Sequence, residues 1–161
     1  MDLQRIVFFK DLPDEMFEFD IPEGAQIIDW SEQFKQILAD PNYGLSAEGL
    51  TKDEACKRIV EQYWQAMIDE DWEKARKLRS FPEGRLWEDM KAQYYDNMPA
   101  EIIEIQQPYS EDGWVTTAIV IRMSDGTVTR NKLMIKFRQI NNIEWCHIVG
   151  NYGPRELNSI E

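Results

Sequence analysis

The residue with the clearest acid–base chemistry in this sequence is His147, its only histidine. A neutral imidazole can act as a general base near neutral pH, usually beside a carboxylate that orients it. No such carboxylate can be assigned to His147, which shares one face of an expected strand with Trp145 and Val149 because side chains alternate along a strand. We interpret His147 first as a hydrogen-bonded structural residue and secondly as a ligand contact.

Aromatic side chains provide a second kind of candidate site, a pocket for an amphipathic small molecule. The chain holds 6 Trp, 6 Tyr and 7 Phe. Several of them lie at helical spacing, which is equally typical of core packing, so both interpretations stand. The candidates for this pocket are Tyr63, Trp64, Met67, Trp87, Tyr94, Trp145 and His147.

Other catalytic signatures are missing from the sequence. One histidine cannot build a multi-histidine metal site, and the glycines lack the spacing of a phosphate-binding loop. No GxSxG or HExxH motif occurs. The sequence therefore predicts no metal, no cofactor and no identifiable catalytic residue.

Cys56 and Cys146 are the only cysteines, and they lie too far apart in sequence for a metal-binding box. We expect two buried free thiols. The alternative is a disulfide from the first long helix to the last strand, which would imply an oxidising compartment.

The net charge of the chain limits the kinds of partner that it can bind. Thirty acidic residues against 18 basic ones give a net charge of −12, which repels nucleic acid and anionic membranes. No apolar run approaches the roughly 20 residues that span a bilayer, and the first residues do not resemble a secretory signal. We expect a soluble chain, either cytoplasmic or the soluble part of an exported protein.

One strand of this acidic chain carries a basic row, formed by Arg130, Lys132, Lys136 and Arg138. Its members alternate with the apolar residues Leu133, Ile135 and Phe137, which is typical of the solvent side of an antiparallel sheet. The alternative is an interface for an acidic element, either the chain's own N-terminal extension or a second subunit. The interface candidates are Arg130, Lys132, Met134, Lys136 and Arg138.

Three helices are expected in the middle of the chain. Thr51 and Glu54 have capping-box spacing at the start of a helix that reaches Ile68. A second helix is predicted from Trp72 to Leu78, and a third lies between Gly84 and Pro99. The first helix should bury one face, which carries Ala55, Ile59, Val60, Tyr63, Trp64 and Met67.

Beyond Pro99 the spacing of apolar residues changes to two, which is typical of strands. Turn signals at 124–126 and 141–142 indicate an antiparallel meander, with the last strand running from Ile143 to Val149. Ile119 and Leu133 share a side only if the first loop has an odd length, so we predict a three-residue loop with Gly126 in the left-handed conformation. The polar residues predicted to point inward are Thr117, Thr129 and Asn131.

The domain organisation follows from these elements. Residues 1–50 are expected to form an N-terminal extension that wraps the domain, with a short strand at 17–21 and a short helix at 30–39. Tyr43, Leu45 and Leu50 are expected to hold its last part against the core. Residues 51–153 form one α+β domain, and residues 154–161 form a C-terminal tail.

The order of elements, together with IVEQYWQAM at 59–67, DWEKA at 71–75 and WCHIVG at 145–150, resembles the nuclear transport factor 2-like superfamily, also described as cystatin-like. The resemblance covers residues 51–153. It implies a cone-shaped domain in which helices cover the concave face of a curved antiparallel sheet and leave a pocket at the open end. It also implies, for some members, a homodimer through the sheet face.

Members of that superfamily include small-molecule isomerases, dehydratases and cyclases as well as transport adaptors and accessory domains, so the fold does not decide the function. An isomerase would need an aspartate base and neutral oxyanion donors in an apolar cavity, and the inward positions carry no such set. We therefore expect a non-enzymatic domain that binds a small amphipathic molecule or a protein partner. The alternative is an isomerase-, dehydratase- or cyclase-like enzyme.

Overall fold

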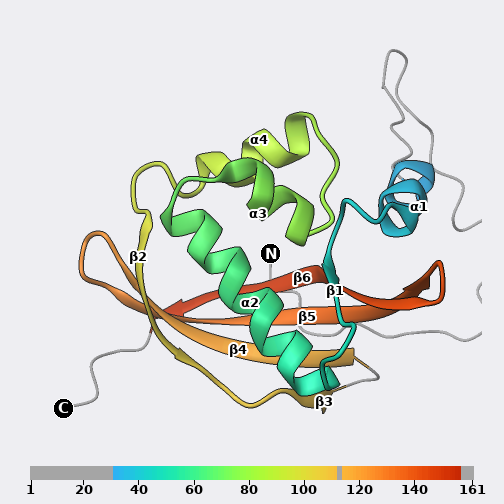
Figure 1. Cartoon of the computed structure of the whole chain (residues 1–161). Coiled ribbons are helices and arrows are strands. Elements are labelled where there is room, and N and C mark those ends of the chain that lie inside the picture. Colours follow the sequence, from blue (N-terminus) through green and yellow to red (C-terminus); the bar gives the residue numbers. More distant parts are fainter. Residues whose placement is uncertain (1–30, 112–113, 157–161) are drawn as a thin grey trace, which may run out of the picture.

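The computed structural model describes residues 31–111 and 114–156. Within them, four helices and six antiparallel strands form an α+β fold, and the sheet curls strongly into a half-barrel (Figure 1). The elements are α1 (Ser31–Ala39), β1 (Leu45–Ser46), α2 (Lys52–Ile68), α3 (Trp72–Leu78), α4 (Arg85–Ala92), β2 (Pro99–Ile105), β3 (Tyr109–Glu111), β4 (Trp114–Met123), β5 (Val128–Ile140) and β6 (Ile143–Glu156).

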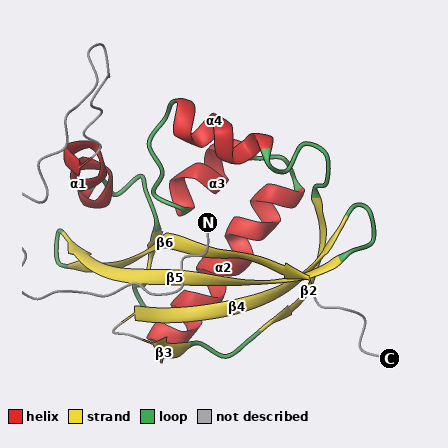
Figure 2. Ribbon diagram, turned by 180° about the vertical axis from the view of Figure 1, so that it is seen from behind, coloured by secondary structure: helices red, strands yellow, loops and turns green. Residues whose placement is uncertain are grey.

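Helix α2 lies across the concave face of the sheet, as Figures 1 and 2 show from opposite sides. Its start is fixed by the predicted capping box: Glu54 N donates to the Thr51 hydroxyl over 3.2 Å, and Thr51 N donates to the Glu54 carboxylate over 2.8 Å. Ile59, Tyr63 and Met67 are fully buried along the helix face that meets the sheet. The first predicted helix and its buried face are confirmed.

The two shorter helices α3 and α4 are also present, and they lie on the same side of the sheet as α2 (Figure 2). The third predicted helix ends earlier than expected, at Ala92, so Tyr94 lies in the turn that follows it. Asp71 caps α3 by accepting from Lys74 N over 3.1 Å. Helix α4 follows Gly84, whose φ of +123° is open to glycine but not to most other residues. Helix α1, at the right of Figure 1, matches the short helix expected at 30–39 and buries only Ile37.

The strand order of the sheet is β1-β6-β5-β4-β2, with β3 pairing to β4. Thr117 faces Leu133 and Ile119 faces Asn131, so the odd-numbered residues of β4 and β5 lie together on one face. That face meets the helices, because Ile119 and Leu133 belong to the same buried cluster as α2. The even-numbered residues form the outer face.

Both hairpin predictions are confirmed. Met123 N donates to Thr127 O over 2.8 Å, which closes a three-residue loop, and Gly126 has a φ of +89°. Ile140 pairs with Ile143, and the two residues between them, Asn141 and Asn142, have φ values of 51° and 64°. Two consecutive positive φ angles are typical of a type I′ turn, which asparagine tolerates.

Two features of the sheet also differ from the prediction. Strand β6 continues past Val149 to Glu156, where it pairs with Thr129 at the far end of β5. The polar sequence after Val149 has no apolar period that predicts a strand, whereas the backbone of this segment continues to pair with β5. At the other end, β1 pairs with β6, so residues 45–46, which no strand was predicted to include, form an edge strand of the sheet.

The expected anchors between α1 and α2 are confirmed. Leu45 and Leu50 pack against the core, and the Tyr43 hydroxyl accepts a hydrogen bond from Arg76. The strand expected at 17–21 lies outside the described residues.

Cys56 and Cys146 are buried and free, as predicted. Burial raises the pKa of each thiol to about 12, and the charge of Asp53 adds to the effect at Cys56. The Cys146 thiol is 3.8 Å from the carbonyl of Ala55, so it lies beneath the first turn of α2. Both thiols are therefore protonated packing groups in the folded chain.

Candidate functional site

A cavity of about 270 Å³ opens between the helices and the β4–β5 hairpin. This size lies just below the roughly 300–1,000 Å³ of typical small-molecule sites. Trp64 of α2 forms one wall, and Tyr94, which follows α4, meets it edge to face at a ring distance of 6.2 Å. The other lining residues are Gln93, Asn97, Ile121, Met123, Asp125, Thr127, Thr129 and Asn131.

The polar groups inside this cavity are largely uncharged. Asn131 and Thr129, buried on β5, share a hydrogen bond of 3.3 Å from the asparagine amide to the threonine hydroxyl. The indole N–H of Trp64 is buried and has no hydrogen-bond partner among the described residues. Leaving a buried donor unpaired costs about 1–3 kcal/mol.

The mouth of the cavity is held by a clamp between the hairpin loop and the residues after α4. Asn97 donates to the Asp125 carboxylate over 2.9 Å and accepts from the Ser124 hydroxyl over 3.1 Å. Ser124 N also donates to Met98 O over 2.7 Å. These bonds fix the loop and so define the width of the opening.

The titratable groups that line the cavity are Tyr94 and Asp125, and neither is suited to acid–base catalysis near neutral pH. Burial raises the pKa of the Tyr94 hydroxyl, so it stays protonated. Hydrogen bonds from Thr127, followed by Asn97, lower the pKa of Asp125, so this rim carboxylate stays ionised. The described lining therefore supports hydrogen bonding and not proton transfer.

The predicted pocket residues are only partly brought together. Trp64 and Tyr94 line the cavity, and Tyr63 lies behind Trp64 at a ring distance of 5.3 Å. Met67 and Trp87 are core residues, while Trp145 is half-buried on β6 and does not line the cavity. Thr129 and Asn131 point inward as predicted, whereas Asn97 and Asp125 were not predicted as lining residues.

His147 lies outside the concave cavity. Its Nδ1 shares a hydrogen bond of 2.7 Å with the Ser80 hydroxyl, and a Cβ at Gly44 would come within 2.6 Å of the same nitrogen. The ring is fully buried, and burial, followed by the charge of Arg138, lowers its pKa to about 4. These contacts favour a neutral, structural imidazole that fastens β6 to the segment after α3.

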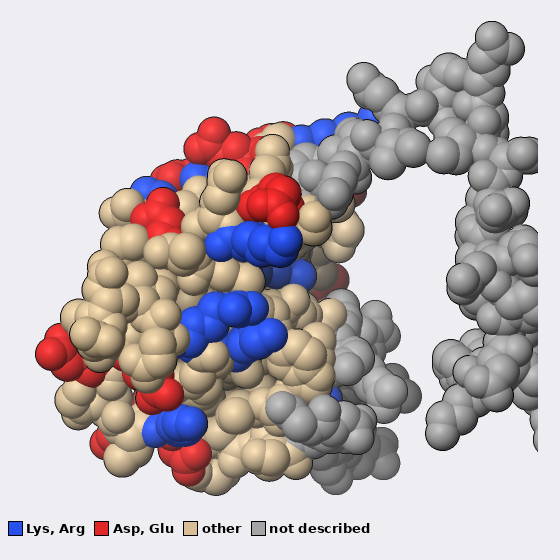
Figure 3. Space-filling view, turned by 90° about the vertical axis from the view of Figure 1, so that its right-hand side faces the viewer, with Lys and Arg blue, Asp and Glu red and all other residues tan. Residues whose placement is uncertain are grey.

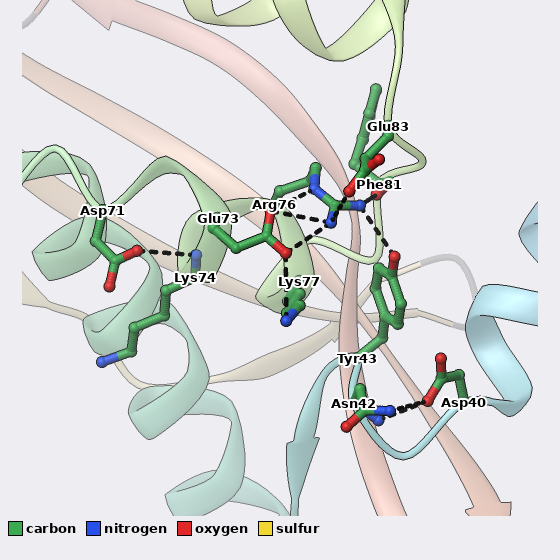
Figure 4. A network of polar contacts seen from close by, with 10 residues as sticks. All are labelled: Asp40, Asn42, Tyr43, Asp71, Glu73, Lys74, Arg76, Lys77, Phe81 and Glu83. Atoms are coloured by element: carbon green, nitrogen blue, oxygen red, sulfur yellow. Dashed lines mark hydrogen bonds and ion pairs between the residues drawn. The ribbon is translucent and has the colours of Figure 1, made fainter.

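A buried arginine near the end of α3, Arg76, holds the segment after α3 in place (Figure 4). Arg76 donates to the Glu73 carboxylate at 2.8–3.0 Å, to Glu83 at 3.1 Å, and to Tyr43 and the Phe81 carbonyl at 3.0 Å each. The bonds from Arg76 hold the pKa of Glu73 below its usual range. Arg76 follows Trp72 by four residues, which puts it on the buried face of the helix, so its burial could have been predicted.

The predicted basic row lies on the outer face of the sheet, and three of its members contact side chains on or beyond β4. Arg130 donates to the Gln106 side chain over 2.6 Å. Lys132 lies 5.7 Å from the Tyr109 ring, and Lys136 lies 5.3 Å from the Trp114 ring. Their side chains therefore lie along the outer face instead of projecting freely from it.

In the described part of the chain, no three His, Cys, Asp or Glu side chains are grouped as metal ligands. None of the helices in that part has the length and apolar composition needed to cross a bilayer. No family model, curated protein or solved structure gave a significant match to the chain.

Proposed function

We propose that this chain is a non-enzymatic binding domain of the nuclear transport factor 2-like kind, whose ligand is a small amphipathic molecule held in the concave cavity. The observation that carries the proposal is the unpaired indole N–H of Trp64 in the wall of a cavity of about 270 Å³. The arrangement of helices over a curled sheet, with the cavity at one end, supports the family assignment.

The chemistry of the lining defines the ligand class. Trp64, Tyr94 and Ile121 offer apolar contact, so most of the ligand surface is apolar. Trp64 is a donor only, so the ligand carries an acceptor such as a carbonyl oxygen. Asp125 at the rim is ionised, which disfavours an anion there. A neutral ring compound with one carbonyl group fits these conditions.

Catalysis is the less favoured function. An isomerase or dehydratase needs a titratable group near the reacting atoms. Tyr94 and Asp125, the titratable groups among the described lining residues, both have pKa values displaced away from neutrality. A binding role requires no such group.

The test is a thermal-shift screen of the full chain against a library of neutral ring compounds that each carry one carbonyl. A compound at about 100 times its Kd adds about 2.7 kcal/mol of stability, which raises Tm by roughly 5–10 °C for a chain of this size. We expect Thr127→Phe, which fills the mouth of the cavity, to abolish the rise. Trp64→Phe should weaken binding up to about tenfold by removing one hydrogen bond.

Val128→Phe is the matched control, because Val128 follows Thr127 directly, begins β5 and lies on the outer face of the sheet opposite Arg122. This variant should keep the ligand-induced rise in Tm. The proposal is wrong if no compound produces a saturable rise, or if Thr127→Phe and Val128→Phe respond to the compound alike.

A further inference from the structure

A second hollow, of about 280 Å³, lies on the outer face, separate from the concave cavity. Phe34 and Leu38 of α1 form one side, Phe81 after α3 meets Phe34 at a ring distance of 6.2 Å, and Trp114 of β4 closes the other side. We call this hollow the outer groove. Figure 3, which views the molecule from the α1 side, has lysine and arginine side chains gathered among mainly uncharged ones.

Two cations of the outer groove have no anionic partner among the described residues. Lys136 and Arg138 line it, and no carboxylate in the described part of the chain forms an ion pair with either. Arg79 also lines the groove, but its guanidinium donates to the Tyr63 hydroxyl over 3.3 Å and to the Met90 sulfur over 2.6 Å. The Nε of Arg138 is buried and has no hydrogen-bond partner among the described residues. Two such cations beside apolar walls, in a chain of net charge −12, indicate an occupant that is both apolar and acidic.

The sequence before α1 has this chemistry. Residues 1–30 contain eight acidic and two basic residues, a net charge of −6. Within them, the segment 14–23 (DEMFEFDIPE) alternates Phe17, Phe19 and Ile21 with Glu18 and Asp20. Such alternation gives an extended segment one apolar side and one acidic side.

The same segment is tethered next to the outer groove. Helix α1 begins at Ser31, and its residues Phe34 and Leu38 already form a wall of the groove. Residues 24–30 separate this helix from the segment and span at most about 25 Å when extended. A short tether of this kind gives an effective concentration on the order of millimolar, which favours the chain's own segment over a second molecule.

We propose that residues 14–23 dock in the outer groove, with Phe17, Phe19 and Ile21 against its apolar walls and acidic side chains beside Lys136 and Arg138. The occupied groove ties the N-terminal part of the chain to the outer face of the sheet. This inference is independent of ligand binding in the concave cavity.

The test uses the full chain and a carbodiimide, which joins a carboxylate directly to a neighbouring lysine amine. We expect a cross-link between segment 14–23 and Lys136, found by peptide mass spectrometry in protein of monomeric mass. Lys136→Arg keeps the charge, so it should remove that cross-link without changing the hydrogen exchange of the segment.

Hydrogen exchange measures the docking itself. Glu18→Lys with Asp20→Lys should speed the exchange of residues 14–23 about tenfold, as expected for the loss of two ion pairs. Adding Lys136→Glu with Arg138→Glu should restore slow exchange, because the charges are then reversed on both sides. Asp2→Lys with Asp11→Lys is the matched control and should leave the exchange of the segment unchanged.

Three results would overturn the proposal. The first is a cross-link found only in protein of dimeric mass, which would make a second copy the occupant. The second is cross-linking of the segment to lysines away from the outer groove, or none at all. The third is equal exchange of residues 14–23 in the parent chain and the Glu18→Lys, Asp20→Lys variant.

Discussion

His147 illustrates how one residue's surroundings decide its chemistry. A solvated imidazole titrates near neutral pH, but this ring is enclosed by Ser80, Gly44 and the neighbouring strand and faces the charge of Arg138. Its pKa is lowered to about 4 from the usual 6.5, so it stays neutral where a pH switch would charge it. The same burial that removes it from catalysis makes it a source of acid sensitivity.

We predict that His147 makes the chain less stable as the pH falls from about 6.5 to about 4. Above this window the imidazole is neutral in both states, and within it the unfolded chain binds the proton first, so stability is lost toward the acid side. The loss should be about 1–3 kcal/mol. Urea unfolding at pH values across the window measures it.

His147→Asn is the control, because asparagine keeps a polar atom near the position of Nδ1 and does not titrate. Its stability should fall less steeply over the same pH window. Identical pH profiles for the parent chain and the variant would contradict the prediction, since the acid sensitivity would then come from other groups.

At the scale of elements, α2 depends on local signals at its start and on burial along its length. The capping box satisfies two backbone N–H groups, and the fully buried Ile59, Tyr63 and Met67 anchor the helix to the sheet. A helix of 17 residues is only marginally stable alone in water, so the packing supplies most of its stability. The cap decides where the helix begins.

We predict that Thr51→Ala lowers the free energy of unfolding by about 1 kcal/mol, because Glu54 N loses its acceptor. Thr51→Ser should retain most of the stability, since its hydroxyl can accept the same bond. Urea denaturation of the three proteins provides the measurement. An alanine variant as stable as the parent would mean that water replaces the cap at no cost.

At the scale of the whole molecule, the curled sheet has a stable centre and less supported margins. Strands β4, β5 and β6 pair along most of their length, and their inward side chains pack on α2. By contrast, α1 buries only Ile37, and β1 contributes two residues to the edge. Local unfolding should follow this difference.

We predict that the amides of β5 and of the buried side of α2 exchange only through global unfolding, while those of α1 exchange by local opening at a much lower free energy. Native-state hydrogen exchange with mass spectrometry resolves these regions. Protection of α1 equal to that of β5 would contradict this, and would mean that α1 opens only with the whole fold.

Particular residues mark how far the sequence could predict this structure. Thr51 with Glu54, Gly126, and Asn141 with Asn142 are local signals, so the start of α2 and both hairpin turns were predictable. The cavity was only partly predicted: Trp64 and Tyr94 were expected at it, and Thr129 and Asn131 only on the inward face of the sheet, but Asn97 and Asp125 were not. The latter pair meets across 28 positions of the chain, a contact that no local pattern encodes.

The sequence by itself determined the fold class, the start of α2, both hairpin turns and the basic row on one side of β5, because each depends on neighbours within a few residues. Only the tertiary structure decided that His147 pairs with Ser80 and not with a carboxylate, that the Trp64 N–H has no partner, and that Lys136 and Arg138 border a hollow. These properties depend on burial and on distant partners, which are set by how the helices pack on the curled sheet.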